Sequence, residues 1–299
     1  MMRLAAYIVR GPNQATLAVV LFALLSLFLP LVGLLSSASV ALVALRQGMA
    51  QSGRVVVAAA AVLCLAGMAL TGALWAPLLY GALMWLPVWA VALLLRITRH
   101  IGWALECAAL LGLLGVSAIY AAVADPSAMW AERFRALLIP LAQRAGSAET
   151  GQIEQLGDWF SAYLTGIVAA GSVSSVIVSL ILARWWQASL FNPGGFAHEF
   201  TQMRLHKGTH YLGLVCVLLA FTGSAAASEY FWNMSIVLVV LFVVLGFSIV
   251  HRLFASKANK RFWLAGLYVL AMLVPQTLLP VALLGITDAW VNWRERLAR

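Results

Sequence analysis

Long apolar runs separated by short polar stretches dominate this chain. A transmembrane helix needs about 20 consecutive apolar residues, and runs of that size recur along the whole sequence. The pattern predicts an all-α protein, a polytopic transmembrane helical bundle of about eight or nine membrane segments. No hydrophilic stretch is long enough for a separate soluble domain, so we expect a single integral membrane domain over residues 1–299. The apolar runs cover 15–45, 55–70, 75–95, 101–124, 160–183, 209–224, 231–250 and 262–286.

Proline interrupts the first and the last of these runs. Pro30 lies at the centre of 15–45, and Pro275 and Pro280 lie within 262–286. A proline removes a backbone hydrogen bond and kinks or breaks a helix. For the first run, the sequence allows two short or tilted helices that meet near Pro30, or one kinked helix with a partly re-entrant arm.

Polar residues between 125 and 158 differ in character from the other loops. This segment holds five of the ten acidic residues but only three of the nineteen basic ones. Apolar side chains recur in it at helical spacing, which predicts an amphipathic helix on the membrane surface, bent or ended by Pro140. These side chains are Trp130, Phe134, Leu137, Leu138 and Leu141, and the acids are Asp125, Glu132, Glu149, Glu154 and Asp158.

The two ends of the chain also carry recognisable patterns. Arg3 and Arg10 precede the run 15–45, which is far longer than the ~7–15-residue core of a secretory signal peptide, so we expect a retained membrane segment. The tail 287–299 predicts a short interfacial helix with three apolar residues on one face. These residues are Trp290, Trp293 and Leu297.

Composition places the chain in a membrane rather than in water. Hydrophobic residues make up 64% of the sequence, charged residues only 10%, and the mean hydropathy is +0.96. A soluble domain carries about 25% charged residues. The net charge of +9 lies in short loops between apolar runs, which is the positive-inside pattern of a membrane protein and excludes a nucleic-acid-binding groove. The expected contacts are with the lipid bilayer.

The loop charges predict an orientation. With the N-terminus inside and 15–45 counted as a hairpin, every basic loop falls on the cytoplasmic side, and the 125–158 segment and a turn at Glu229 fall outside. A single last span would put the C-terminus outside, whereas a re-entrant break at Pro275 would bring it inside. The basic loops are 46–54, 96–100, 184–207 and 251–261.

The segment 184–208, called here the motif segment, combines interfacial and turn residues. Arginine and tryptophan favour the boundary between lipid and water, while proline fixes φ and glycine permits positive φ. We therefore expect a cytoplasmic loop that serves as a docking or gating element. Its candidate residues are Arg184, Trp185, Trp186, Asn192, Pro193, Gly194 and Gly195.

Glu106 is the clearest ionisable group inside a predicted span. Intramembrane acids mark proton relays or cation sites. The alternative, which we favour, is a carboxylate near the interface that pairs with Arg99 or Arg96, since Arg99 lies seven residues back on the same helical face.

Other clusters favour packing over chemistry. His206 and His210 have the i, i+4 spacing of a metal pair, but no HExxH pattern accompanies them, so we expect no metal. The three cysteines lie in apolar runs without metal or redox spacing. Small residues at two predicted spans favour close helix packing, with a substrate-lining role as the alternative. They are Gly102, Gly112, Gly115, Gly171, Ser172, Ser174, Ser175 and Ser179.

Motifs for catalysis and nucleotide binding are missing from the sequence. The turn at 192–195 lacks GxxxxGK[ST] and GxGxxG, and neither GxSxG nor a metalloprotease motif occurs. We therefore expect no enzyme activity and no cofactor.

Two segments resemble the YybS-like proteins, a family of bacterial inner-membrane proteins. One is 184–196, with its Trp-Trp and Asn-Pro-Gly-Gly. The other is 284–290, which contains Asp288 and is followed by Arg294 and Arg296. The resemblance covers nearly the whole chain and implies a multi-pass location in a bacterial inner membrane. That family is distantly similar to the substrate-binding subunits of energy-coupling-factor vitamin transporters, which implies a compact helical bundle that binds a small molecule.

Two functions follow as hypotheses. The first is a transporter-like small-molecule-binding subunit, with substrate entering near 125–158 and an ATPase subunit on a separate chain docking at the motif segment. The second is a membrane scaffold or assembly factor that recruits a cytoplasmic partner through the same segment. A membrane enzyme acting on lipids ranks third, and the sequence leaves the oligomeric state open.

Overall fold

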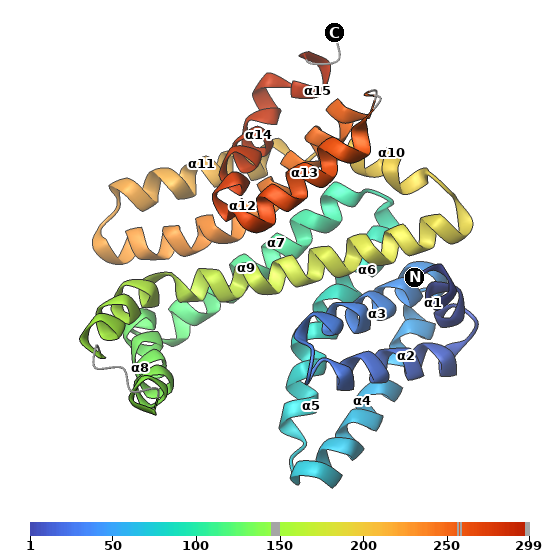
Figure 1. Ribbon diagram of the computed structural model, residues 1–299, viewed down its shortest axis with the longest axis horizontal. Coiled ribbons are helices and arrows are strands. Elements are labelled where there is room, and N and C mark those ends of the chain that lie inside the picture. The colour runs from blue at the N-terminus through green and yellow to red at the C-terminus, as the bar shows by residue number, and fades with distance from the viewer. Residues whose placement is uncertain (145–149, 256, 258, 297–299) are drawn as a thin grey trace.

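The computed structural model describes residues 1–144, 150–255, 257 and 259–296, and within them every regular element is a helix (Figure 1). The all-α expectation is therefore confirmed. Glu149, Leu297 and Arg299 lie outside the described residues, as do the side chains of Leu141 and Glu154.

One short helix at the start of the chain is followed by a hairpin of two longer ones. Ser36 donates a hydrogen bond to the Val19 carbonyl at 2.8 Å and ties the two arms together. The interruption expected near Pro30 is confirmed, in the form of two helices rather than one kinked helix. The arms have 14 and 15 residues, or about 21 and 22 Å, and the second arm reaches the length of a membrane span only together with the 3-10 turn that precedes it. The elements are α1 (Met2–Ile8), α2 (Pro12–Leu25), η1 (Pro30–Val32) and α3 (Gly33–Gln47).

A second helical hairpin follows without the predicted loop at 46–54. Gly48 alone separates two helices, and its φ of +83° lies in the left-handed region that favours glycine. The polar residues after Gly48 form the first turns of a helix instead of a loop. Gly72, with φ +68°, ends that helix where the sequence predicted a turn. The elements are α4 (Met49–Thr71), α5 (Trp75–Tyr80), the π-helical η2 (Gly81–Trp85) and α6 (Leu86–Thr98).

The longest helix, α9, runs across the whole molecule (Figure 1). It has 42 residues, about 63 Å, roughly twice the thickness of a hydrocarbon core. The predicted amphipathic helix exists as α8, and Pro140 lies inside it rather than ending it. Trp130 of α8 donates to Thr165 Oγ1 of α9 at 2.8 Å. The elements are α7 (Ile101–Ala122), α8 (Pro126–Arg144) and α9 (Thr150–Phe191).

The C-terminal part folds back on itself. Glu229 lies within α12 rather than in a turn and accepts a hydrogen bond from the Tyr120 hydroxyl at 2.7 Å. The expected break is confirmed at Pro275, where η3 begins, while Pro280 lies inside α14. The tail does not form one interfacial helix, because α14 extends through Trp290 to Val291. The elements are α10 (Gly195–Thr201), α11 (Lys207–Thr222), α12 (Ala225–Phe254), α13 (Lys260–Leu273), η3 (Pro275–Thr277), α14 (Leu278–Val291) and α15 (Trp293–Arg296).

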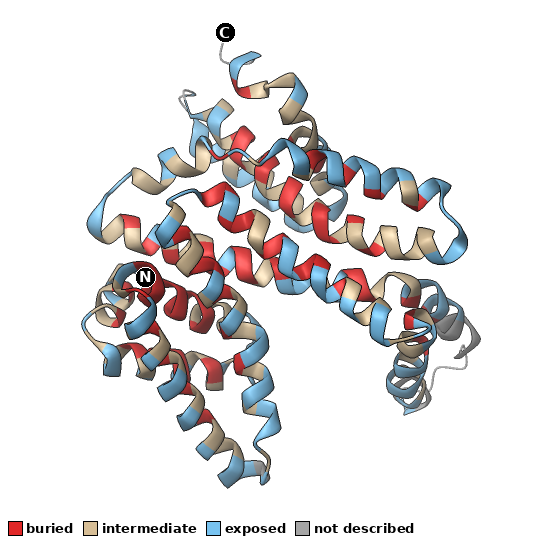
Figure 2. Ribbon diagram, turned by 180° about the vertical axis from the view of Figure 1, so that it is seen from behind, coloured by how far each residue is buried: buried red, intermediate tan, exposed pale blue. Residues whose placement is uncertain are grey.

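Buried residues gather on α3, α9 and α12, whereas α4 and α13 are largely exposed (Figure 2). Helices α12 and α14 approach most closely at two glycines. A Cβ on Gly246 would overlap the Val281 carbonyl, and a Cβ on Gly285 would overlap the Phe242 carbonyl. Small residues allow this approach between apolar helices.

Six helices of the described part are long and apolar enough to cross a membrane. The expected eight or nine segments are not confirmed, because α2 and α11 are shorter than a span and the last run, 262–286, forms two helices of 14 residues each, α13 and α14. The six cover Pro30–Gln47, Met49–Leu70, Trp75–Thr98, Ile101–Ala122, Gln155–Phe191 and Ala225–Phe254.

The basic segments meet at one end of the bundle, called here the basic end. Contacts such as Arg96 to Leu45, Arg184 to Glu199 and Arg294 to Met203 join segments that the sequence separates widely. The connection from α7 to α8 and the turn between α11 and α12 lie on the other side of the molecule from α10 (Figure 1). The C-terminal hairpin therefore returns α15 to the basic end, as a re-entrant break requires.

Candidate functional site

The motif segment is a helix end, a tight turn and a short helix. Helix α9 continues to Phe191, so Arg184, Trp185 and Trp186 are helical, and the prediction of a loop for them is wrong. The turn itself is confirmed at the next residues, where Gly195 N–H donates to the Asn192 carbonyl at 3.0 Å. Gly194 has φ +87°, a conformation that other residues adopt only with strain.

The two tryptophans of the motif have different surroundings. Trp185 is 39% exposed, but Trp186 is fully buried in the core. The interfacial interpretation is therefore wrong for Trp186. Adjacent residues of a helix point about 100° apart, and here Trp186 points into the core while Trp185 remains partly exposed. The Trp186 indole N–H is buried without a hydrogen-bond partner among the described residues.

Arg184 holds α10 against α9. Its Nε donates to Glu199 Oε2 at 2.9 Å, its Nη2 pairs with Glu199 Oε1, and its Nη1 donates to Gln187 Oε1 at 2.9 Å. The planar fork of an arginine suits this two-pronged pairing with a carboxylate. This ion pair joins the two helices that flank the Asn-Pro-Gly-Gly turn and so holds the turn in place.

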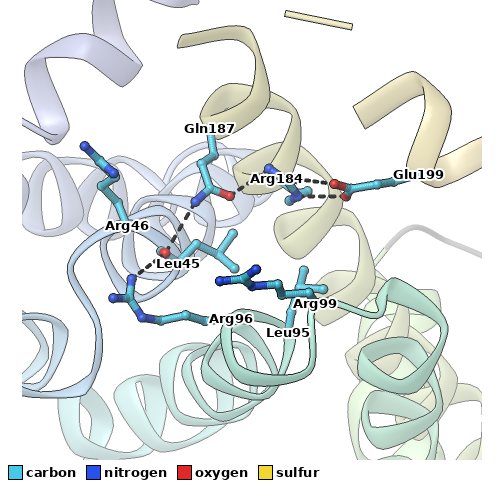
Figure 3. Close-up of a pocket in the computed structure, with 8 residues that line it drawn as sticks. All are labelled: Leu45, Arg46, Leu95, Arg96, Arg99, Arg184, Gln187 and Glu199. Carbon is cyan, nitrogen blue, oxygen red and sulfur yellow. Dashed lines mark hydrogen bonds and ion pairs between the residues drawn. The ribbon is translucent and has the colours of Figure 1, made fainter. Parts of the chain in front are cut away.

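Arg184 also faces a cavity of about 410 Å³, called here the arginine pocket (Figure 3). Residues from α3, α6, α9 and α10, with Arg99 just after α6, enclose it. Arg96 Nη1 donates to the Leu45 carbonyl at 2.7 Å, and Gln187 Nε2 approaches the same carbonyl at 3.3 Å. The lining residues are Leu45, Arg46, Leu95, Arg96, Arg99, Arg184, Gln187 and Glu199.

Positive charge exceeds negative charge in this pocket. Four arginines line it, and Glu199 is its one carboxylate. Arg46 lies over the Phe191 ring, 4.3 Å from the centroid, in a cation–π contact. Arg99 has φ +55°, and its guanidinium makes neither a hydrogen bond nor an ion pair within the described part of the chain (Figure 3). Such a site attracts anions.

The sequence analysis used Arg46, Arg96 and Arg99 to orient the chain, and Arg96 and Arg99 also as predicted partners of Glu106, but it did not place them in one site. Their convergence with Arg184 depends on how α3, α6 and α9 pack, and no local pattern encodes it. The sequence does contain one indication of this site: Arg46 and Arg96 each lie in the last turn of an apolar helix, and both helices end on the same side of the bundle.

A second cavity of about 370 Å³, called here the aromatic pocket, lies on the other side of the α9–α10 turn. Aromatic rings form much of its wall, and they contact each other: Phe200 meets the His251 ring edge-on at 5.4 Å between centroids. Trp185 and Gly194 of the motif line it, together with Ile181, Ala188, Ser189, Phe196, Ala197, Phe200, Thr201, His251 and Tyr268.

Glu106 does not pair with Arg99 or Arg96, so that prediction is wrong. Its Oε1 accepts hydrogen bonds of 2.6 Å from the His206 backbone N–H and from the Thr209 hydroxyl. The carboxylate therefore binds the first turn of α11, where the helix dipole favours negative charge. These partners lie about a hundred positions away in the sequence. Helical spacing relates only residues of the same helix, so it could not identify them.

Asp288 joins the C-terminal hairpin to the basic end. Its Oδ2 lies 2.5 Å from Arg294 Nη1, and Arg294 Nη2 donates to the Met203 carbonyl at 2.8 Å. Asp288 is therefore a buried anchor, and it does not contact the motif turn directly.

The remaining candidates are engaged in local structure. Ser172 and Ser175 donate to carbonyls of their own helix, four residues back. His206 Nδ1 accepts from the Gly208 N–H, and His210 is buried against Phe242 and Trp290. No group of three metal-ligating side chains forms in the part of the chain that the structure describes.

Comparison with known families gives one match. Residues 143–289 match the family described as "Predicted membrane protein (DUF2232)", just under half of the chain. This chain is a multi-pass membrane protein. The matched region includes the motif segment and Asp288, while the arginines of α3 and α6 precede it. No curated protein and no solved structure matches the chain.

Proposed function

We propose that the protein is a transporter-like membrane subunit that binds a small anionic molecule in the arginine pocket. The observation that carries the proposal is the convergence of Arg46, Arg96, Arg99 and Arg184 on one cavity with a single carboxylate, Glu199. Its volume of about 410 Å³ is within the ~300–1,000 Å³ of small-molecule sites. The ligand then binds at the basic end, and not beside 125–158 where the sequence predicted substrate entry.

The basic end would face the cytoplasm of a bacterial cell, in its inner membrane. Excess lysine and arginine on one side supports this orientation, and the resemblance of the motif to YybS-like proteins supports the location. The chain has no phosphate loop, so an ATPase subunit on a separate chain would supply any energy for transport. In this proposal the chain binds and positions its ligand without catalysing a reaction.

The test is to identify what the purified protein carries. Full-length protein is purified in mild detergent as wild type, as the double variant Arg46→Ala/Arg99→Ala, and as Arg54→Ala. Arg54 has the same charge and lies in the first turns of α4, but it does not line the pocket. Mass spectrometry of the extracts should find an anionic molecule with the wild type and Arg54→Ala and lose it with the double variant. Equal recovery from all three would refute the proposal.

A scaffold that recruits a cytoplasmic partner is the second candidate, and the aromatic pocket favours it. Trp185 is 39% exposed beside this cavity, and aromatic residues in pockets anchor protein interfaces. The partner would insert an apolar side chain between Phe200 and Tyr268. Co-purification separates the two functions: ATPase subunits retained by wild type support transport, whereas an envelope or division protein lost on Trp185→Ala supports the scaffold.

A further inference from the structure

The charge of the arginine pocket defines the ligand that fits it. Four guanidinium groups and one carboxylate leave an excess of three positive charges. Helices α3 and α6 both direct their C-terminal ends at the cavity, through Leu45 and Leu95. Each helix end carries about half a negative charge, so together they offset about one more, and roughly two positive charges remain.

The hydrogen bonds of the pocket show which arginines carry the excess positive charge. The Arg184 guanidinium donates hydrogen bonds to Glu199, and the Arg96 guanidinium donates one to the Leu45 carbonyl. Arg46 contacts only the Phe191 ring, which leaves its N–H donors free, and Arg99 has no partner within the described residues. Two exposed guanidinium groups without a hydrogen-bond partner among the described residues therefore line one cavity, from α3 and from the end of α6.

Phosphate matches this arrangement better than a carboxylate does. A phosphate monoester carries about −1.5 to −2 charges at pH 7 and three acceptor oxygens. Guanidinium groups bind such oxygens in pairs of parallel hydrogen bonds. A single carboxylate would neutralise only half of the remaining charge and would supply two oxygens. The cavity of about 410 Å³ has room for further ligand atoms beyond the phosphate.

We propose that the arginine pocket binds a phosphate group, with Arg46 and Arg99 as its principal donors. This inference rests on the proposed function and names the class of its ligand. The phosphate belongs either to a soluble phosphorylated molecule or to a phospholipid headgroup, because the pocket lies at the ends of membrane helices. The recognition chemistry is the same for both.

The experiment measures binding of defined probes to the full-length protein in nanodiscs. Inorganic phosphate is titrated into protein in phosphatidylcholine nanodiscs, with acetate at equal ionic strength as the control anion. In a second arm, nanodiscs contain phosphatidic acid, whose headgroup is a phosphate monoester, and native mass spectrometry counts retained lipid. Added salt should weaken binding in both arms, because it screens charges at an open site.

Four variants assign any binding to the pocket. Arg99→Ala and Arg46→Ala should each weaken binding about tenfold or more, the loss expected for a hydrogen bond to a charged group. Arg99→Lys retains the charge without the planar fork and should fall between wild type and Arg99→Ala. Arg54→Ala should stay within about twofold of wild type, because Arg54 is exposed, does not line the pocket and is screened by salt. Circular dichroism and elution profiles establish that each variant is folded.

Binding of inorganic phosphate that is lost in Arg99→Ala supports a soluble ligand, and selective retention of phosphatidic acid with the same loss supports a lipid headgroup. Equal responses to phosphate and acetate, with no preference for phosphatidic acid, overturn the inference. Equal losses in Arg99→Ala and Arg54→Ala overturn it too. If the pocket variants lose the co-purifying molecule but no phosphate probe binds, the ligand class is wrong and the proposed function stands. If no phosphate probe binds and no anionic molecule co-purifies with the wild type, the proposed function is wrong as well.

Discussion

The Asp288 carboxylate and the Arg294 guanidinium form an ion pair of 2.5 Å in which the two side chains are only 9% and 7% exposed. Arg294 also donates to the Met203 carbonyl and to Ser248 Oγ. Burial lowers the pKa of Arg294, while the neighbouring carboxylate of Asp288 opposes that shift. This pair connects the C-terminal hairpin to α12 and to the linker between α10 and α11.

Replacing Asp288 with Ala should destabilise the protein strongly. The substitution leaves the Arg294 charge buried and unpaired, which costs about 3–5 kcal/mol. The control is Glu295→Ala, which breaks the exposed pair with Arg204 at 3.4 Å and should cost no more than about 1 kcal/mol. Thermal unfolding in detergent measures both.

A double variant tests the interpretation of this pair. Asp288→Leu/Arg294→Met removes both charges, so most of the stability should return. If Asp288→Ala unfolds at the same temperature as Glu295→Ala, the buried pair makes no special contribution.

Glu106 should act through hydrogen bonding rather than through proton exchange. Glu106→Ala removes the acceptor for the His206 N–H and the Thr209 hydroxyl and should cost about 1–2 kcal/mol. Glu106→Gln keeps an acceptor oxygen, so it should retain most of the stability and should bind the ligand as the wild type does. Thermal unfolding and hydrogen exchange at the start of α11 report the difference. A Glu106→Gln variant that is stable and binds ligand but no longer supports transport would instead identify a proton relay.

The sequence predicts those features that single residues or local patterns determine. Pro30 breaks the first run because it lacks an N–H, and Gly72 ends α4 because it adopts positive φ, so both were predicted. Polar residues after Gly48 were misread as a loop, since polar side chains fit equally well on the first turns of a helix. The end of α9 was predicted too early, because a polar residue such as Arg184 is compatible both with the last turns of a helix and with a loop.

The candidate site was predicted only in part, because its other half comes from tertiary packing. The motif around Gly194 has a local pattern that indicates a turn. The arginines at 46, 96 and 99 approach Arg184 only when α3 and α6 pack against α9. The partners of Glu106 likewise depend on the path of the chain between α10 and α11.

The two chain termini should lie on the same side of the membrane. Gln47 Nε2 contacts the Val9 carbonyl at 3.4 Å and Arg294 contacts Met203, so α1 and α15 are both at the basic end. Green fluorescent protein fused before Met1 or after Arg296 should fluoresce, and alkaline phosphatase inserted at Asp125 should be active, because the first reporter works inside and the second outside. Opposite results at the two termini would contradict the re-entrant C-terminal hairpin.

Gly246 should tolerate no larger side chain, because α12 and α14 touch there. A Cβ on Gly246 would overlap the Val281 carbonyl, and backbone atoms cannot move aside as a flexible side chain can. Gly246→Ala should therefore cost about 1–3 kcal/mol through overpacking. Gly266→Ala is the matched control, since a Cβ there meets nothing within 4 Å. It should raise stability by up to about 1 kcal/mol through helix propensity. Thermal unfolding of the two purified variants gives opposite shifts if the contact is as close as described, and equal shifts would show that α12 and α14 separate freely at this point.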